Sequence, residues 1–317
     1  GYYDPARDTL YVVERVEEAQ LEMVLVHEMV HALQDQYVDL DSLMHANLEA
    51  NDRSMAAQAA LEGHATFAML EWQLAQLMGD AADLTALPGL EGLLGDDPLA
   101  AAGIEMPVLS DAPAVIRESL LFPYIGGLVF VQKHWSGPWG RVPPLGAEMP
   151  VSTEQVLHPE LFEPGRMDMP TDVRFVDDPP SGWTEVYADG LGELETRILL
   201  REFLPSRDEA DGAAAGWDGD RFRLLDGPTG EAFLWATVWD SDRDALQFET
   251  AVGRALTERY GGSPGAAGRE IRVLRGAVAR RPVVTVWDLP AELPAPADLE
   301  TLARLELEEP PPPPTAR

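Results

Sequence analysis

Two histidines and a glutamate lie within one five-residue stretch, His27-Glu28-Met29-Val30-His31. On a helix, residues four apart project from the same face about one turn apart, so both imidazoles can bind one metal ion. Glu28 then lies beside the first ligand, where its carboxylate can act as a general base on a water molecule. This spacing therefore predicts a zinc site that hydrolyses peptide bonds.

The third ligand decides the kind of site. A metzincin needs Gly and His where this chain has Gln34 and Tyr37, which excludes that class. Glu62 is the favoured third ligand, because a carboxylate among small and apolar neighbours is costly unless it is paired or bound to a metal. Glu49, in a polar stretch that is typical of a solvated loop, and His64 are the alternatives.

The hydrophobic spacing predicts the elements that carry these side chains. A short strand at Thr9–Val13 precedes a helix from about Glu17 to Tyr37, which carries both histidines. A second helix, with Glu62, is expected from Ser54 as its N-cap to Gly79. A third begins after Asp111, with Pro113 in its first turn, and ends near His134.

The second half of the sequence has a different pattern. Residues 136–190 are rich in Pro and Gly, apart from a short helix at Ser152–Leu157, and Gly216–Asp220 is interpreted as a turn. We therefore expect an α+β fold, with a mainly helical domain at 1–185, a smaller antiparallel α+β domain at 186–309 and a Pro-rich tail at 310–317. The later elements expected are helices at Gly192–Leu204 and from the capping box at Ser241 to Tyr260, and strands at Arg221–Leu225, Ala232–Trp239, Glu270–Leu274 and Val283–Leu289.

The amino-acid composition limits the kinds of partner and of metal ligand that the protein can have. The chain has 55 acidic and 23 basic residues, a net charge of −32, which argues against nucleic acid as a partner. The partner expected from the predicted zinc site is a peptide or protein substrate. It has no cysteine, so metal ligands must be His or carboxylates. No transmembrane segment is expected, because no uninterrupted apolar stretch approaches the required length. Since Gly1 replaces an initiator Met, we expect a removed signal peptide, anchor or pro-segment, and hence an extracytoplasmic location.

Several motifs resemble a family of gluzincin-like proteins from bacteria and archaea. The clearest are the stretch from His27 to Gln36, which reads HEMVHALQDQ, and Glu62-Gly63-His64-Ala65. The resemblance implies a zincin-like fold for the first domain, zinc bound by His27, His31 and Glu62, and Glu28 as the base. Relatives often have Asp at the position of His64. Further similar segments are Gly1–Pro5, Phe122-Pro123-Tyr124, Ser152–Pro159 and Ala215–Arg221.

Three further residues are candidates for supporting roles. His158 and Tyr124 are proposed as donors that stabilise an oxyanion, and Asp35 as an acceptor that orients a ligand imidazole. Each has a simpler interpretation: His158 as a residue that fixes a loop, Tyr124 as a core residue and Asp35 as part of a solvated helix face. The strand Thr9–Val13 is a candidate edge for an extended peptide.

Two functions fit these observations. The first is a zinc metallopeptidase with Glu28 as its base. The alternative is a catalytically silent binding or scaffold protein of the same fold, in which zinc only supports the structure, as the acidic charge and the Pro-rich tail would suit. A hydrolase of a non-peptide bond is a third possibility.

Overall fold

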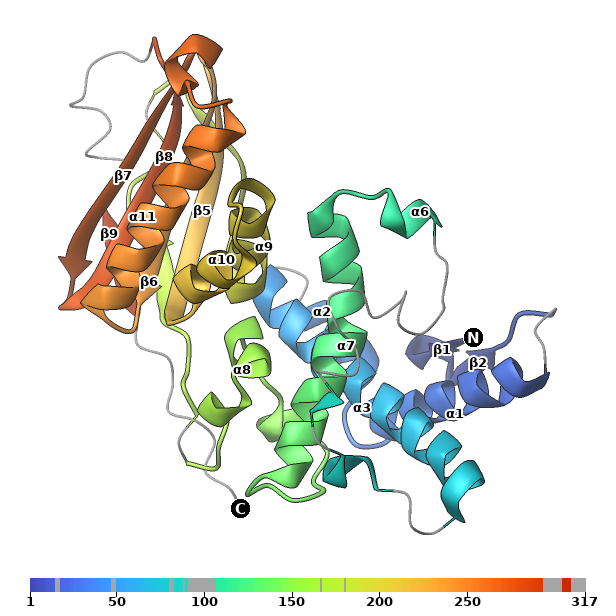
Figure 1. Cartoon of the computed structure of the whole chain (residues 1–317). Helices are drawn as coiled ribbons and strands as arrows, with labels where there is room; N and C mark the ends of the chain where they lie inside the picture. Colours follow the sequence, from blue (N-terminus) through green and yellow to red (C-terminus); the bar gives the residue numbers. More distant parts are fainter. Residues whose placement is uncertain are drawn as a thin grey trace. The chain divides into compact units, whose positions relative to one another are not determined.

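The computed structural model describes residues 1–14, 18–46, 50–79, 83–87, 89–90, 107–165, 167–179, 181–292 and 304–308, and shows an α+β chain of two compact units (Figure 1). The first unit comprises mainly Gly1–Glu49 and Arg53–Asp168, and the second comprises Ala50–Asp52 and Met169–Pro312. The junction therefore lies before the predicted position at 185/186, because strands that start at 172 and 184 pair within the second unit. The predicted tail at 310–317 lies outside the described residues.

The first unit is mainly helical. It opens with an antiparallel hairpin, in which Tyr3 pairs with Leu10. The helix with both histidines ends two residues before the predicted Tyr37, and the next long helix begins at Asn51 rather than after Ser54. The elements are β1 (Tyr2–Asp4), β2 (Thr9–Tyr11), α1 (Glu18–Asp35), α2 (Leu40–Ala46), α3 (Asn51–Met78), α6 (Pro107–Ser110), α7 (Ala114–Ser136) and α8 (Thr153–Leu157), with 3-10 turns at Pro5–Arg7, Leu84–Ala86, Gly146–Glu148 and Pro159–Leu161.

Helices α3 and α7 pack in unusually close contact at a pair of glycines. A Cβ on Gly63 would lie 2.1 Å from the backbone carbon of Gly127, and a Cβ on Gly127 would lie 2.1 Å from the carbonyl oxygen of Ala59. Only glycine permits this approach. The crossing fixes Glu62, next to Gly63, and Tyr124, one turn before Gly127, on facing helices.

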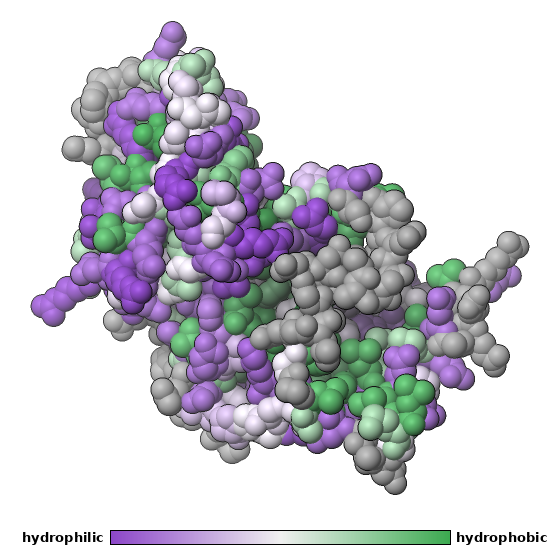
Figure 2. Space-filling view, in the orientation of Figure 1, coloured by the Kyte–Doolittle hydropathy of each residue, from purple (hydrophilic) through white to green (hydrophobic). Residues whose placement is uncertain are grey.

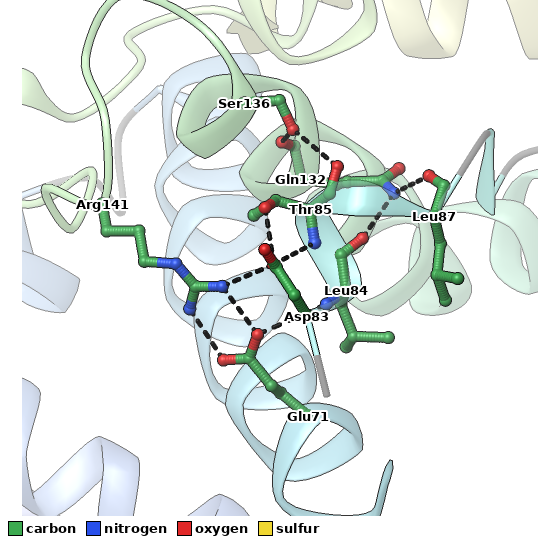
Figure 3. A network of polar contacts seen from close by, with 8 residues as sticks. All are labelled: Glu71, Asp83, Leu84, Thr85, Leu87, Gln132, Ser136 and Arg141. Carbon is green, nitrogen blue, oxygen red and sulfur yellow. Dashed lines mark hydrogen bonds and ion pairs between the residues drawn. The ribbon is translucent and has the colours of Figure 1, made fainter. Parts of the chain in front are cut away.

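A polar network holds the C-terminal halves of α3 and α7 to the turn at Leu84–Ala86 (Figure 3). Arg141 donates to both carboxylate oxygens of Glu71 and to Asp83. Gln132 donates to the carbonyls of Leu84 and Leu87, both at 2.9 Å or less. Because a bidentate Arg–carboxylate pair has one preferred geometry, this network sets the register of the two helices away from the glycine contact.

Within the described residues, α7 is the one helix that is long and apolar enough to cross a membrane by length and composition. The sequence analysis expected none, because it found no uninterrupted apolar stretch that approaches the required length. Core helices pass the same test, and α7 buries Phe130 and Val131 completely. Elsewhere on the first unit, Figure 2 shows hydrophobic surface over the C-terminal part of α3, where Leu77 and Met78 are exposed.

The second unit is a five-stranded antiparallel sheet, in the order β4-β5-β6-β8-β7, with helices on one face. Helix α11 packs on it through apolar residues at helical spacing, among them Phe248, Val252 and Leu256, and Ser241 caps the helix as predicted. A separate strand pair, β3 with β9, contributes to the core on the other face. The elements are β3 (Asp172–Phe175), β4 (Thr184–Asp189), α9 (Gly192–Phe203), α10 (Arg207–Ala214), β5 (Trp217–Gly227), β6 (Gly230–Trp239), α11 (Asp242–Arg259), β7 (Arg269–Val278), β8 (Arg281–Pro290) and β9 (Leu305–Glu308).

The stretch interpreted as a turn at Gly216–Asp220 is instead the beginning of β5, with a bulge between Trp217 and Gly219. Its last residue, Asp220, accepts four N–H groups. Oδ1 accepts from the Gly192 backbone and the Trp217 indole, and Oδ2 accepts from the Leu191 backbone and the Trp235 indole. Asp220 therefore joins the start of α9 to two strands, which explains the Trp-Asp-Gly-Asp sequence as a structural element.

Candidate metal centre

Three side chains from two helices converge on one point in the first unit. His27 Nε2 lies 3.1 Å from Glu62 Oε2 and 3.1 Å from His31 Nε2, and His31 Nε2 lies 3.4 Å from Glu62 Oε2. The two histidines are one turn apart on α1, and Glu62 reaches them from the middle of α3. These are the three ligands that the sequence analysis favoured, and together they could hold a metal ion.

The separations match the size of a coordination site. Bonds of about 2.1 Å from a tetrahedral metal ion place two ligand atoms about 3.4 Å apart. The observed separations of 3.1 to 3.4 Å are close to that value. Without a cation, the lone pairs of two ring nitrogens and a carboxylate oxygen at this distance would face and repel one another. The arrangement therefore favours a bound cation or proton.

The charges of the three groups are coupled. Burial raises the pKa of Glu62, but hydrogen bonds from His27 and His31 outweigh it and lower this pKa to about 2. Burial lowers the pKa of His31, but the hydrogen bond and the charge of Glu62 outweigh it and raise this pKa above its usual value. Glu62 is therefore ionised at neutral pH, as a metal ligand must be.

Gln34 fixes the orientation of His31, a role that the sequence analysis gave to Asp35. Gln34 is 1% exposed, and its Nε2 donates to the Leu61 carbonyl at 2.9 Å. Its Oε1 must therefore accept from His31 Nδ1, 2.8 Å away, which leaves the Nε2 lone pair of His31 directed at the cluster. Asp35 instead accepts from the Tyr3 hydroxyl and the Leu40 backbone, and so holds the hairpin and α2.

His64 belongs to the surroundings of the cluster rather than to its ligands. Its Nδ1 lies 3.1 Å from Gln34 Nε2, which donates to it. Burial and the nearby charge of His31 lower the pKa of His64 to about 4, so this ring is neutral at pH 7. The other alternative ligand, Glu49, lies outside the described residues. The signal available for Gln34 was a polar residue three positions after His31, near one helical turn away, and the sequence analysis used it only to exclude a metzincin.

Glu28 is almost buried and is held by the N-terminal hairpin. Its Oε2 accepts from the Tyr3 backbone N–H at 2.9 Å, and 9% of the residue is exposed. Its charge acts on both His31 and Tyr124. The hairpin thus fixes one oxygen of the Glu28 carboxylate.

The structure brings Tyr124 to the cluster but not His158. The Tyr124 ring stacks near His27, with centroids 6.2 Å apart, and the residue is 44% exposed. Burial and the charges of Glu62 and Glu28 raise its pKa to about 12, which keeps the hydroxyl protonated as a donor. His158 ends α8, where its Nδ1 lies 3.6 Å from Glu160, and Figure 1 draws α7 between α8 and α1.

Comparison with known proteins concerns the other unit. A family described as a domain of unknown function, DUF8575, matches residues 182–289. This match spans β4 to β8. Searches of curated proteins and of solved structures found no match. The histidine and glutamate cluster of the first unit lies outside the matched residues.

Proposed function

We propose that the first unit is a zinc-dependent peptidase with a zincin-like fold, in which His27, His31 and Glu62 hold the metal and Glu28 is the general base. The observation that carries the proposal is the convergence of the three ligand atoms within 3.1 to 3.4 Å. Two imidazoles and one carboxylate are a common protein ligand set of catalytic zinc.

Each residue then has a defined task. Zinc, when bound, supplies Lewis acidity, which lowers the pKa of water and polarises a carbonyl group. Glu28 Oε1 takes a proton from the attacking water and passes it to the leaving amine. Tyr124, protonated and partly exposed beside His27, donates a hydrogen bond to the developing oxyanion. Gln34 keeps His31 in the tautomer that binds metal.

Strand β2 supports a peptide as the substrate. Among the described strands it pairs only with β1, so its second edge is open to an added strand. A peptide that paired there would contribute backbone hydrogen bonds, which depend little on its sequence.

The test combines metal analysis with turnover. The protein is loaded with zinc, its metal content is measured by plasma mass spectrometry, and cleavage of a mixed peptide library is followed by mass spectrometry. We expect about one zinc per chain, and a loss of turnover of about 10²–10⁴-fold in Glu28→Gln. Glu22→Gln, an exposed position on the same helix, is the matched control and should retain activity.

Two results would refute the peptidase. One is stoichiometric zinc with no cleavage of any peptide, which would favour a scaffold with structural zinc. The other is equal turnover by Glu28→Gln and the wild type.

A further inference from the structure

The second unit contains a cavity between its helices and its sheet, remote in sequence from the metal ligands. Its volume is about 420 Å³, within the range of small-molecule sites. The walls are mostly large apolar side chains from α9, α11 and three strands. Chief among them are Leu199, Phe233, Trp235, Leu256 and Val286. Such walls favour an apolar ligand by removing its surface from water.

The polar groups of the cavity are confined to a few residues. Asp288 is buried, and both of its oxygens are occupied: Oδ1 accepts from Arg269 Nε at 2.7 Å, and Oδ2 accepts from the Tyr260 hydroxyl at 2.5 Å. Arg269 also donates to the carbonyls of Glu231 and Asp288. This group is neutralised internally, so it does not call for a charged ligand.

Arg259 differs from these residues. It lies at the end of α11, where it is exposed, with its guanidinium carbon 5.7 Å from the centre of the Tyr260 ring. In the part of the chain that the structure describes, no acceptor is recorded for its N–H groups. Glu231 also lines the cavity, but it is exposed and no described contact orients its carboxylate. Beside its apolar walls, the cavity therefore offers an exposed cation that lies over the Tyr260 ring and is not paired with a described carboxylate.

We propose that this cavity binds one aliphatic chain that ends in a carboxylate, with the chain against the apolar walls and the carboxylate at Arg259. A guanidinium is well suited to a carboxylate, because two parallel N–H groups can donate to its two oxygens. A cationic headgroup would find both Asp288 oxygens already accepting hydrogen bonds, which leaves it only the exposed carboxylate of Glu231 in the cavity lining. All of the lining residues lie within 182–289, so the proposal assigns a ligand class to the matched domain.

The first test measures chain length and charge on the full-length protein by isothermal titration calorimetry below the micelle concentration. Across hexanoate, octanoate and decanoate, affinity should rise about fourfold for each added methylene that enters the cavity. Decyltrimethylammonium should bind at least tenfold more weakly than decanoate. Equal or tighter binding of the cation, or no saturable binding of decanoate, would overturn the proposal.

The second test places the ligand in this cavity. Arg259→Gln should weaken decanoate binding about 10–100-fold, because a charge-assisted hydrogen bond is lost. Arg254→Gln is the matched control: it lies on the same helix, pairs with Glu209 and does not line the cavity. Leu199→Trp fills the cavity from a partly exposed wall and should abolish binding, with circular dichroism to verify its fold. Unchanged affinity in either Arg259→Gln or a folded Leu199→Trp would refute the site.

Discussion

At the scale of single residues, Gln34 is the side chain that the structure adds to the candidate metal centre. Replacing it by Leu removes the acceptor of His31 Nδ1 and the donor to Leu61. Since His31 then loses its fixed tautomer, zinc affinity should fall about 10–100-fold. Competition with a fluorescent chelator measures this directly. Gln36→Leu is the control, because Gln36 is exposed just beyond α1 and, among the described contacts, its side chain donates only to the Ala32 carbonyl. Equal zinc affinities of the two variants would show that Gln34 does not support the metal centre.

The raised pKa of His31 gives a second prediction, with a defined sign. In the metal-free protein, protonated His31 paired with Glu62 contributes stability that is complete below the ordinary pKa of 6.5 and is lost as pH rises through the raised value. Zinc binds the neutral imidazole. Zinc should therefore stabilise the protein most at a pH above the raised pKa of His31, where the stability from the His31–Glu62 pair has been lost. The increase in Tm caused by zinc should therefore grow from pH 5.5 to pH 8.

Two variants test whether the pH dependence of the zinc-induced increase in Tm comes from His31 or from the titration of other groups. His31→Gln should remove both the shift and its pH dependence, whereas His158→Gln, outside the cluster, should retain both. A zinc-induced change in Tm that is constant across this pH range would contradict the coupling of His31 to Glu62.

At the scale of elements, the contact between α3 and α7 sets the distance between Glu62 and Tyr124. Gly63→Ala forces a methyl group against the Gly127 backbone, so the helices must separate at a cost of about 1–3 kcal/mol. Urea unfolding measures that loss, and zinc affinity should fall with it. Gly212→Ala, in open space on α10, should be neutral or stabilise by about 0.4–1 kcal/mol. If Gly63→Ala were equally harmless, the crossing would not position the site.

The helices and strands also show how much of the fold could be predicted from the sequence. The spacing of apolar residues was sufficient to predict α1 and α7, and the capping box was sufficient to predict Ser241 as a cap, because these signals are local. Strand β3 was missed because its partner β9 lies more than a hundred residues later, where Asp172 pairs with Glu308. Likewise, the costly position of Glu62 indicated a ligand, but no local pattern could show that Gln34, rather than Asp35, would face His31.

At the scale of the whole molecule, the two compact units predict two separable unfolding transitions in calorimetry. Saturating zinc, at about a thousand times its Kd, should stabilise the first unit by about 4 kcal/mol and leave the transition of the second unit unchanged.

Asp220→Asn should destabilise the second unit and leave the transition of the first unit unchanged. An amide nitrogen in place of either carboxylate oxygen leaves two buried N–H donors unpaired. At about 1–3 kcal/mol for each, the second transition loses about 2–6 kcal/mol. Asp226→Asn, exposed on the same strand, should change neither transition. A single transition that moved with both zinc and Asp220 would show that the units unfold as one.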